Sequence, residues 1–99
     1  MKDNQEKLLT VAEFRRKGFR VDINHLRRVK GAPGVLALKW HFTNHNLIDP
    51  HGGETEACLV DLKGRVARGT AKVSWRDAYN RKIGIHIALK RALENLENV

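Results

Sequence analysis

The feature that most constrains the fold is a change in the spacing of apolar residues along the chain. Between residues 19 and 73, apolar residues recur at every second position in several short runs, as in strands with one buried face. From residue 74 onward they recur every three to four positions, as in an amphipathic helix. A chain of 99 residues has room for one sheet and one such helix, so we predict a single domain of the α+β class.

The N-terminal part is predicted to contain one short helix. Thr10 can cap it, Glu13 follows at the spacing of a capping box, and Gly18 is a natural end. Residues 1–9 are mostly polar, and we expect them to be flexible. The folded domain is therefore predicted over residues 10–99.

Four strands are predicted between the two helices, connected as local hairpins in an antiparallel sheet. They span residues 19–29, 36–42, 55–61 and 65–73. The connection over residues 44–53 is rich in Asn, Asp, Pro and Gly, and we expect an exposed loop that can move or contact a ligand. The alternation places Trp40 on the inward face of its strand.

The C-terminal helix is predicted to begin at Ser74, with Asp77 in the third position, and to run to about Leu96. Its main apolar stripe should lie across one face of the sheet. The stripe contains Ala78, Ile85, Ala88, Leu89, Ala92, Leu93 and Leu96. Small inward residues on the preceding strand would let this helix pack closely. The predicted order is therefore α-β-β-β-β-α, with the long helix on one face.

A second apolar strip on this helix, made of Tyr79, Ile83 and Ile87, is not explained by the main stripe. One interpretation is that it packs under the first helix or the long loop. The other is that it forms a contact between two copies of the chain. Either a monomer or a homodimer is consistent with the sequence.

Positive charge is the strongest signal in the composition. Nineteen Lys and Arg stand against eleven Asp and Glu, which gives a net charge of +8 and an isoelectric point near 10.2. Residues 15–30 carry seven cations and one Asp, and residues 63–91 carry nine cations and one Asp. If the fold brings these two stretches together, they form one field that attracts phosphates. The alternative is a surface charge that serves solubility.

The half of the chain from Asp49 to Leu96 resembles the double-stranded-RNA-binding domain. Pro50 and His51 precede a strand, the segment GRVARGTAKVS supplies a glycine-containing strand and a cap, and RKIGIHIALKRAL supplies a helix that opens with cations. The family has three strands where we predict four, and paired lysines after the cap where this chain has Trp75 and Arg76. The resemblance implies contacts to phosphates and sugars across adjacent grooves. Its implied contact residues are His45, His51, Arg76, Arg81 and Lys82.

The predicted order of elements is also similar to that of dimeric single-strand-binding coactivator-like proteins. In that arrangement the outward strand residues would form a basic sheet face, and the second apolar strip would help to make the dimer. Those outward residues are Arg20, Asn24, Lys39, Arg68 and Lys72. Stacking of bases needs exposed aromatic rings, whereas this pattern turns Trp40 and Trp75 inward.

No catalytic constellation is found, and we predict neither an enzyme nor a cofactor. His41, His45 and His51 lack the cysteine partners of a common zinc site, so no metal site is predicted. Cys58 lies in the middle of a strand and is expected to be a small packed residue. A single cysteine, the lack of a signal-peptide pattern and the lack of a long apolar run predict a cytoplasmic protein that does not contact a membrane.

The sequence predicts a small basic protein that binds DNA or RNA through its phosphate backbone. The alternative is a protein-binding inhibitor or adaptor that docks on a host enzyme, and a phage or mobile-element origin fits both hypotheses. The candidate phosphate contacts are Arg15, Arg16, Lys17, Arg27, Arg28, His45, His51, Arg68, Lys72, Arg76, Arg81 and Lys82, and the candidate protein interface is Tyr79, Ile83 and Ile87.

Overall fold

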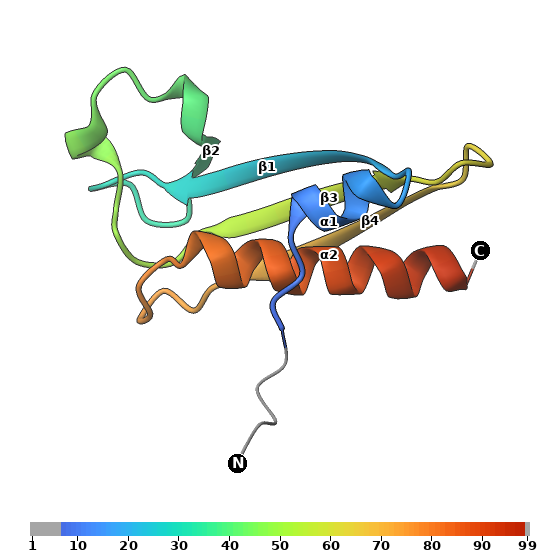
Figure 1. Ribbon diagram of the computed structural model, residues 1–99. Coiled ribbons are helices and arrows are strands. Elements are labelled where there is room, and N and C mark those ends of the chain that lie inside the picture. Colours follow the sequence, from blue (N-terminus) through green and yellow to red (C-terminus); the bar gives the residue numbers. More distant parts are fainter. Residues whose placement is uncertain (1–6, 99) are drawn as a thin grey trace, which may run out of the picture.

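The computed structural model describes residues 7–98 and confirms the α+β order, with two helices on one side of a four-stranded antiparallel sheet (Figure 1). The elements are α1 (Val11–Arg16), β1 (Arg20–Arg28), β2 (Leu36–Leu38), the 3-10 turns η1 (Lys39–His41) and η2 (His45–Leu47), β3 (Glu54–Val60), β4 (Val66–Lys72) and α2 (Arg81–Glu97).

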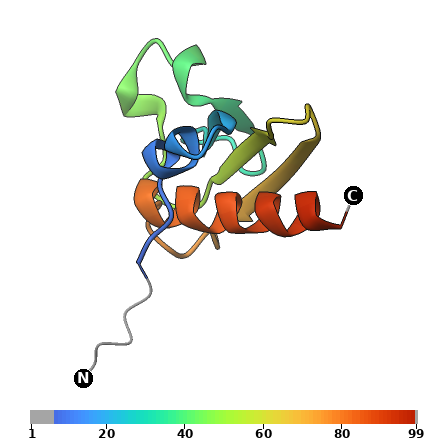
Figure 2. The same ribbon diagram turned by 45° about the vertical axis from the view of Figure 1, so that its right-hand side comes forward.

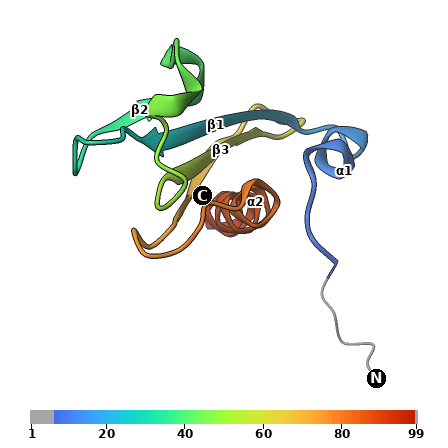
Figure 3. The same cartoon turned by 90° about the vertical axis from the view of Figure 1, so that its left-hand side faces the viewer.

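The strands lie in the order β2-β1-β3-β4, and every pair is antiparallel. β1, β3 and β4 form the long part of the sheet, whereas β2 pairs only with residues 26–28 of β1. The views in Figures 2 and 3 show α2 lying across one face, with α1 beside it, while among the described residues no α-helix covers the other face. The predicted single long helix on one face is therefore confirmed.

Glycine at two positions lets α2 lie directly on the sheet. A Cβ atom on Gly69 of β4 would come within 2.3 Å of the Ala88 carbonyl oxygen and of the Ala92 nitrogen. On the helix side, a Cβ atom on Gly84 would come within 2.5 Å of the Thr55 hydroxyl. At Gly69 the strand backbone thus meets the helix backbone, and at Gly84 the helix backbone meets the buried Thr55 hydroxyl. The expectation that small inward residues allow close packing is confirmed.

The core lies between the sheet and the helices. It contains most of the predicted helix stripe, together with alanines from β3 and β4 and one aromatic residue from α1. Its buried members are Phe14, Val21, Ala57, Leu59, Ala71, Ala88, Leu89 and Ala92. Ile85, Ile87 and Leu93 are partly buried against this cluster. Within residues 7–98, no helix is both long enough and apolar enough to cross a membrane.

The second strand is shorter than the predicted range 36–42. β2 ends at Leu38, and the chain turns through η1, so that Trp40 is 72% exposed rather than inward. Alternation of apolar residues shows that a segment can be a strand, but it does not show how far the segment follows its partner. Here the register with β1 ends at the pair Leu26 and Leu38, where the chain turns away into η1 although β1 itself continues to Arg20.

The long helix begins at Arg81 instead of after Ser74. The Asn80 side chain caps it by accepting a hydrogen bond from the Ile83 N–H. Residues 77–79 do not join the helix because their backbone pairs with the preceding loop: the Tyr79 N–H donates to the Pro50 carbonyl and the Gly52 N–H donates to the Asp77 carbonyl. Consequently Trp75 lies in a loop and is 64% exposed, and Ala78 is exposed too.

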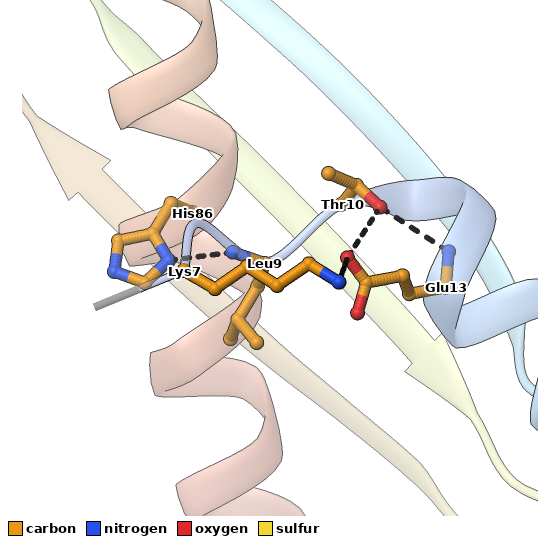
Figure 4. Close-up of polar contacts among 5 residues, drawn as sticks. All are labelled: Lys7, Leu9, Thr10, Glu13 and His86. Carbon is orange, nitrogen blue, oxygen red and sulfur yellow. Dashed lines mark hydrogen bonds and ion pairs between the residues drawn. The ribbon is translucent and has the colours of Figure 1, made fainter. Parts of the chain in front are cut away.

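The segment before α1 is attached to α2. The Leu9 N–H donates to Nδ1 of His86 over 2.9 Å, and the Leu9 side chain packs against the core (Figure 4). Thr10 caps α1 as predicted, because its hydroxyl accepts from the Glu13 N–H. Leu9, the last residue of the predicted flexible segment 1–9, is therefore held by these contacts, and residues 1–6 lie outside the described residues.

Replacing His86 by alanine should release this segment. His86→Ala removes the acceptor of the Leu9 N–H, and we expect a loss of about 1 kcal/mol in the free energy of unfolding. Amide exchange of Leu9 should become faster, and the chain should be cut more readily before residue 10 by a protease. His41→Ala, at an exposed position, is the control. Unchanged exchange at Leu9 would show that this bond does not hold the segment.

Adding a methyl group at Gly69 should separate α2 from the sheet. Because the new Cβ would meet helix backbone rather than a flexible side chain, we expect Gly69→Ala to lower the free energy of unfolding by about 1–3 kcal/mol. Chemical denaturation measures this, with Thr70→Ala on the neighbouring position as the control. Equal stability of Gly69→Ala and the natural chain would contradict the close packing.

Candidate functional site

The topology collects positive charge at one end of the sheet. At one end of the sheet, three neighbouring positions are Leu26 of β1, Glu54 at the start of β3 and Lys72 at the end of β4. The segments 27–53 and 72–82 therefore extend from this same end (Figure 1). These two segments contain eight Lys and Arg against two Asp. We call them the cationic end. They hold a charge of +6, most of the net charge of the chain.

Within the cationic end, the loop that carries His51 is joined to the start of α2. His51 and Ala78 form an antiparallel bridge, next to the hydrogen bond from Tyr79 to Pro50. The helix then opens with Arg81 and Lys82, both exposed, and has no acidic residue in its first turn. Cations at this position oppose the helix dipole, so they are not there to stabilise the helix.

A polar network inside the molecule holds this junction in place. The Tyr79 hydroxyl is hydrogen-bonded to Nδ1 of His25 and, over 2.8 Å, to the hydroxyl of the fully buried Thr55. The Arg27 guanidinium lies 4.1 Å from the centre of the Tyr79 ring and donates to the Asp49 carbonyl. Residues from β1, β3 and both connecting segments are thereby fixed to one another.

The pKa values around this network reflect burial and the positive surroundings. Burial lowers the pKa of His25, and the charges of Arg81, Lys39 and Arg27 lower it further. Burial raises the pKa of Tyr79, so its hydroxyl stays protonated. The His51 N–H, which donates to the Asp49 carboxylate over 2.9 Å, lowers the pKa of that carboxyl. Protonation of His25 is thus disfavoured first by its burial and then by the neighbouring cations.

Two exposed tryptophans at the cationic end were not among the sequence candidates. Trp75 has the Arg76 guanidinium 4.9 Å from its ring centre, and the Trp40 ring centre lies 3.6 Å from that of His41. Exposed aromatic rings beside cations are the usual means of stacking nucleic-acid bases. The sequence interpretation that both rings point inward is wrong, because the strand and helix boundaries differ from those predicted.

The structure divides the predicted phosphate contacts into three groups. Arg28, His45, His51, Arg76, Arg81 and Lys82 lie at the cationic end, together with Lys30 and Lys39, which the candidate set lacked. Arg27 also lies there, but it is partly buried and its guanidinium is engaged with Tyr79 and Asp49. Arg15, Arg16 and Lys17 lie at the opposite end, where Lys17 shares a hollow with Lys63. Each basic stretch is therefore divided between the two ends: Arg28 lies at the same end as Arg81, whereas Lys17 lies with Lys63 at the opposite end.

The third group, Arg68 and Lys72, points to the sheet face opposite α2, and Lys72 is also the first residue of the second segment of the cationic end. This face is not uniformly basic, because Asp22, Glu54 and Glu56 point to the same side. Asp22, Glu56 and Arg68 line one hollow of about 280 Å³, and Cys58 is among its other lining residues. Cys58 is accordingly half-exposed on this face rather than packed in the core. Lys39, predicted as an outward strand residue, lies in η1.

The second apolar strip is divided by the fold. Ile87 packs against the core and Tyr79 belongs to the buried network, whereas the Ile83 side chain remains exposed. In the part of the chain that the structure describes, no three His, Cys, Asp or Glu residues lie close enough to hold a metal ion. His41, His45 and His51 thus do not form a cluster.

Comparison with known proteins gives no relative. No family model, no curated protein and no solved structure matches the chain.

The network at His25 should make stability depend on pH. Because the folded protein lowers the pKa of His25 below the ordinary 6.5, the unfolded chain binds a proton at a higher pH than the folded chain. The contribution of neutral His25 is fully present above about pH 6.5 and is lost as the pH falls toward the lower pKa of the folded state.

Denaturant unfolding at pH 8 and pH 5 tests this. We expect the loss of stability between the two pH values to be smaller in His25→Gln than in the natural chain, whereas His41→Gln should behave as the natural chain does. Because each variant is compared with itself at two pH values, any change in stability that the substitution causes at both pH values cancels. An equal loss in His25→Gln and the natural chain would contradict the prediction.

Proposed function

We propose that this protein binds nucleic acid through phosphate contacts made by its cationic end. The observation that carries the proposal is the junction between the His51 loop and the start of α2, where Arg81 and Lys82 are exposed on a helix turn without acidic residues. A helix N-terminus offers free N–H groups and a positive dipole, so added cations there favour an anion such as phosphate.

The observed helix start also supports the resemblance to double-stranded-RNA-binding domains. With the cap at Asn80, the paired cations Arg81 and Lys82 follow the cap directly, as the paired lysines do in that family. β2 is a three-residue strand in the connection between β1 and β3, which leaves three long strands between the helices. The position of the paired cations and the number of long strands are thus closer to the family pattern than the sequence predicted. Because that family binds RNA, RNA is the nucleic acid that we favour.

The geometry gives less support to the sheet face as the binding surface. Three carboxylates, those of Asp22, Glu54 and Glu56, stand among its cations, and they would repel phosphates. We therefore place the binding surface at the end of the sheet rather than on its face. With Cys58 free, a reducing cytoplasm is the compartment that we propose for this activity.

A pair of charge reversals tests the proposal. We expect Arg81→Glu with Lys82→Glu to weaken binding of labelled RNA at least about tenfold, and to reduce the dependence of log affinity on log salt by about two. Acidic residues suit the first turn of a helix, so this variant should fold. Fluorescence anisotropy at several salt concentrations measures both quantities, on single- and double-stranded RNA and DNA.

The matched control is Lys63→Glu with Lys90→Glu. It changes the net charge equally at exposed positions away from the cationic end. Equal weakening by both variants would mean that only the overall charge matters, and it would contradict the proposed site. Absence of salt-dependent binding to every oligonucleotide would overturn the function itself. The protein-binding hypothesis would then remain, with the exposed Ile83 as the contact to test by Ile83→Asp.

A further inference from the structure

The edge of β1 is open over most of its length. β2 pairs only with residues 26–28, so within residues 7–98 no strand pairs with the part of β1 from Arg20 to His25 on that side. The Arg15 side chain donates to the Val21 carbonyl and the Val29 N–H donates to the Val35 carbonyl, both from that side. Because backbone groups alternate along a strand, the N–H and carbonyl of Ile23 face the same open side.

A hollow of about 380 Å³ lies along this open edge. Its floor is formed by residues 23–25 of β1, and its walls come from the turns that follow β2. The walls contribute Lys39, Trp40, Phe42 and His45. The volume falls in the range of sites for small ligands. The hollow thus combines an exposed indole, a phenyl ring, imidazoles, one ammonium group and hydrogen-bonding backbone groups.

The charge of this hollow differs from that of three other surface hollows. Those contain Glu94, Asp61, or Asp22 with Glu56, and a carboxylate would repel a phosphate. The hollow beside Trp40 is lined by no carboxylate. Its surroundings are positive, since Lys39 and Arg81 both act on His25 at its floor. A flat, π-rich ligand with negative charge is the chemical class that suits it.

We propose that this hollow binds one unpaired nucleotide of the nucleic acid, with its base stacked on Trp40 and its phosphate beside Lys39. This inference rests on the proposed function and gives it a substrate class: RNA that carries an unpaired nucleotide next to a duplex. The free backbone groups of Ile23 would hydrogen-bond the edge of the base, while the cationic end holds the adjoining phosphates.

The test compares two RNAs and three variants of the full chain. One RNA is a blunt duplex, and the other is the same duplex with one bulged nucleotide; binding is followed by fluorescence anisotropy. Stacking of one base contributes about 1–3 kcal/mol, so we expect Trp40→Ala to weaken binding of the bulged RNA about tenfold. Binding of the blunt duplex should change less than about twofold. Trp40→Phe should retain most of the affinity, because phenylalanine also stacks.

Leu62→Ala is the control, since Leu62 is an exposed apolar residue away from the cationic end that does not line the hollow. It should leave both affinities unchanged. If both RNAs bind and Trp40→Ala weakens neither, or weakens both equally, the nucleotide site is overturned while the proposed function stands. If neither RNA binds in a salt-dependent way, the function and the site are overturned together.

Discussion

The direct contact between α2 and the sheet is the constraint on which the rest of the structure depends. Gly69 presents no side chain to the helix, so the backbone near Ala88 and Ala92 rests on β4 itself. Gly84 does the same for Thr55 from the helix side. Because these two close contacts, one with backbone and one with the Thr55 side chain, would both be disturbed by a shift of the helix, they favour one position of α2 along the sheet. That position brings its first turn to the end where β1 and β4 finish.

The buried network then determines how the loops lie around that turn. Tyr79 joins Thr55 and His25, and Arg27 covers its ring, so the segment before the helix is held to β1 and β3. Hydrogen bonds within such a network strengthen one another in a buried environment, and this favours one arrangement over many. The bridge at His51 follows from it, and so does the exposure of Trp75 in a short, fixed loop.

The charges at this end do not serve folding. Arg81 and Lys82 oppose the helix dipole, and Arg81 also disfavours protonation of His25. Arrangements that cost stability locally are expected where a protein binds something, because the ligand offsets the cost. An anion bound beside Arg81 would offset the unfavourable interaction with the helix dipole and would weaken the effect of this cation on His25. Exposed indoles lie nearby, and because such rings can stack on flat ligands we propose nucleotides rather than a simple anion.

The local patterns of the sequence determined the α+β order, the cap of α1, the close packing over Gly69 and the amount of positive charge, since each depends on residues near one another in the chain. They also named Arg81, Lys82 and His51. Tertiary structure alone decided that Asn80 rather than Ser74 caps α2, that β2 stops at Leu38, and hence that both tryptophans are exposed. It also separated the cations of α1 from those of α2. The physical reason is that a backbone group or a charge takes its partner from distant segments, and no pattern along the chain records which partner that is.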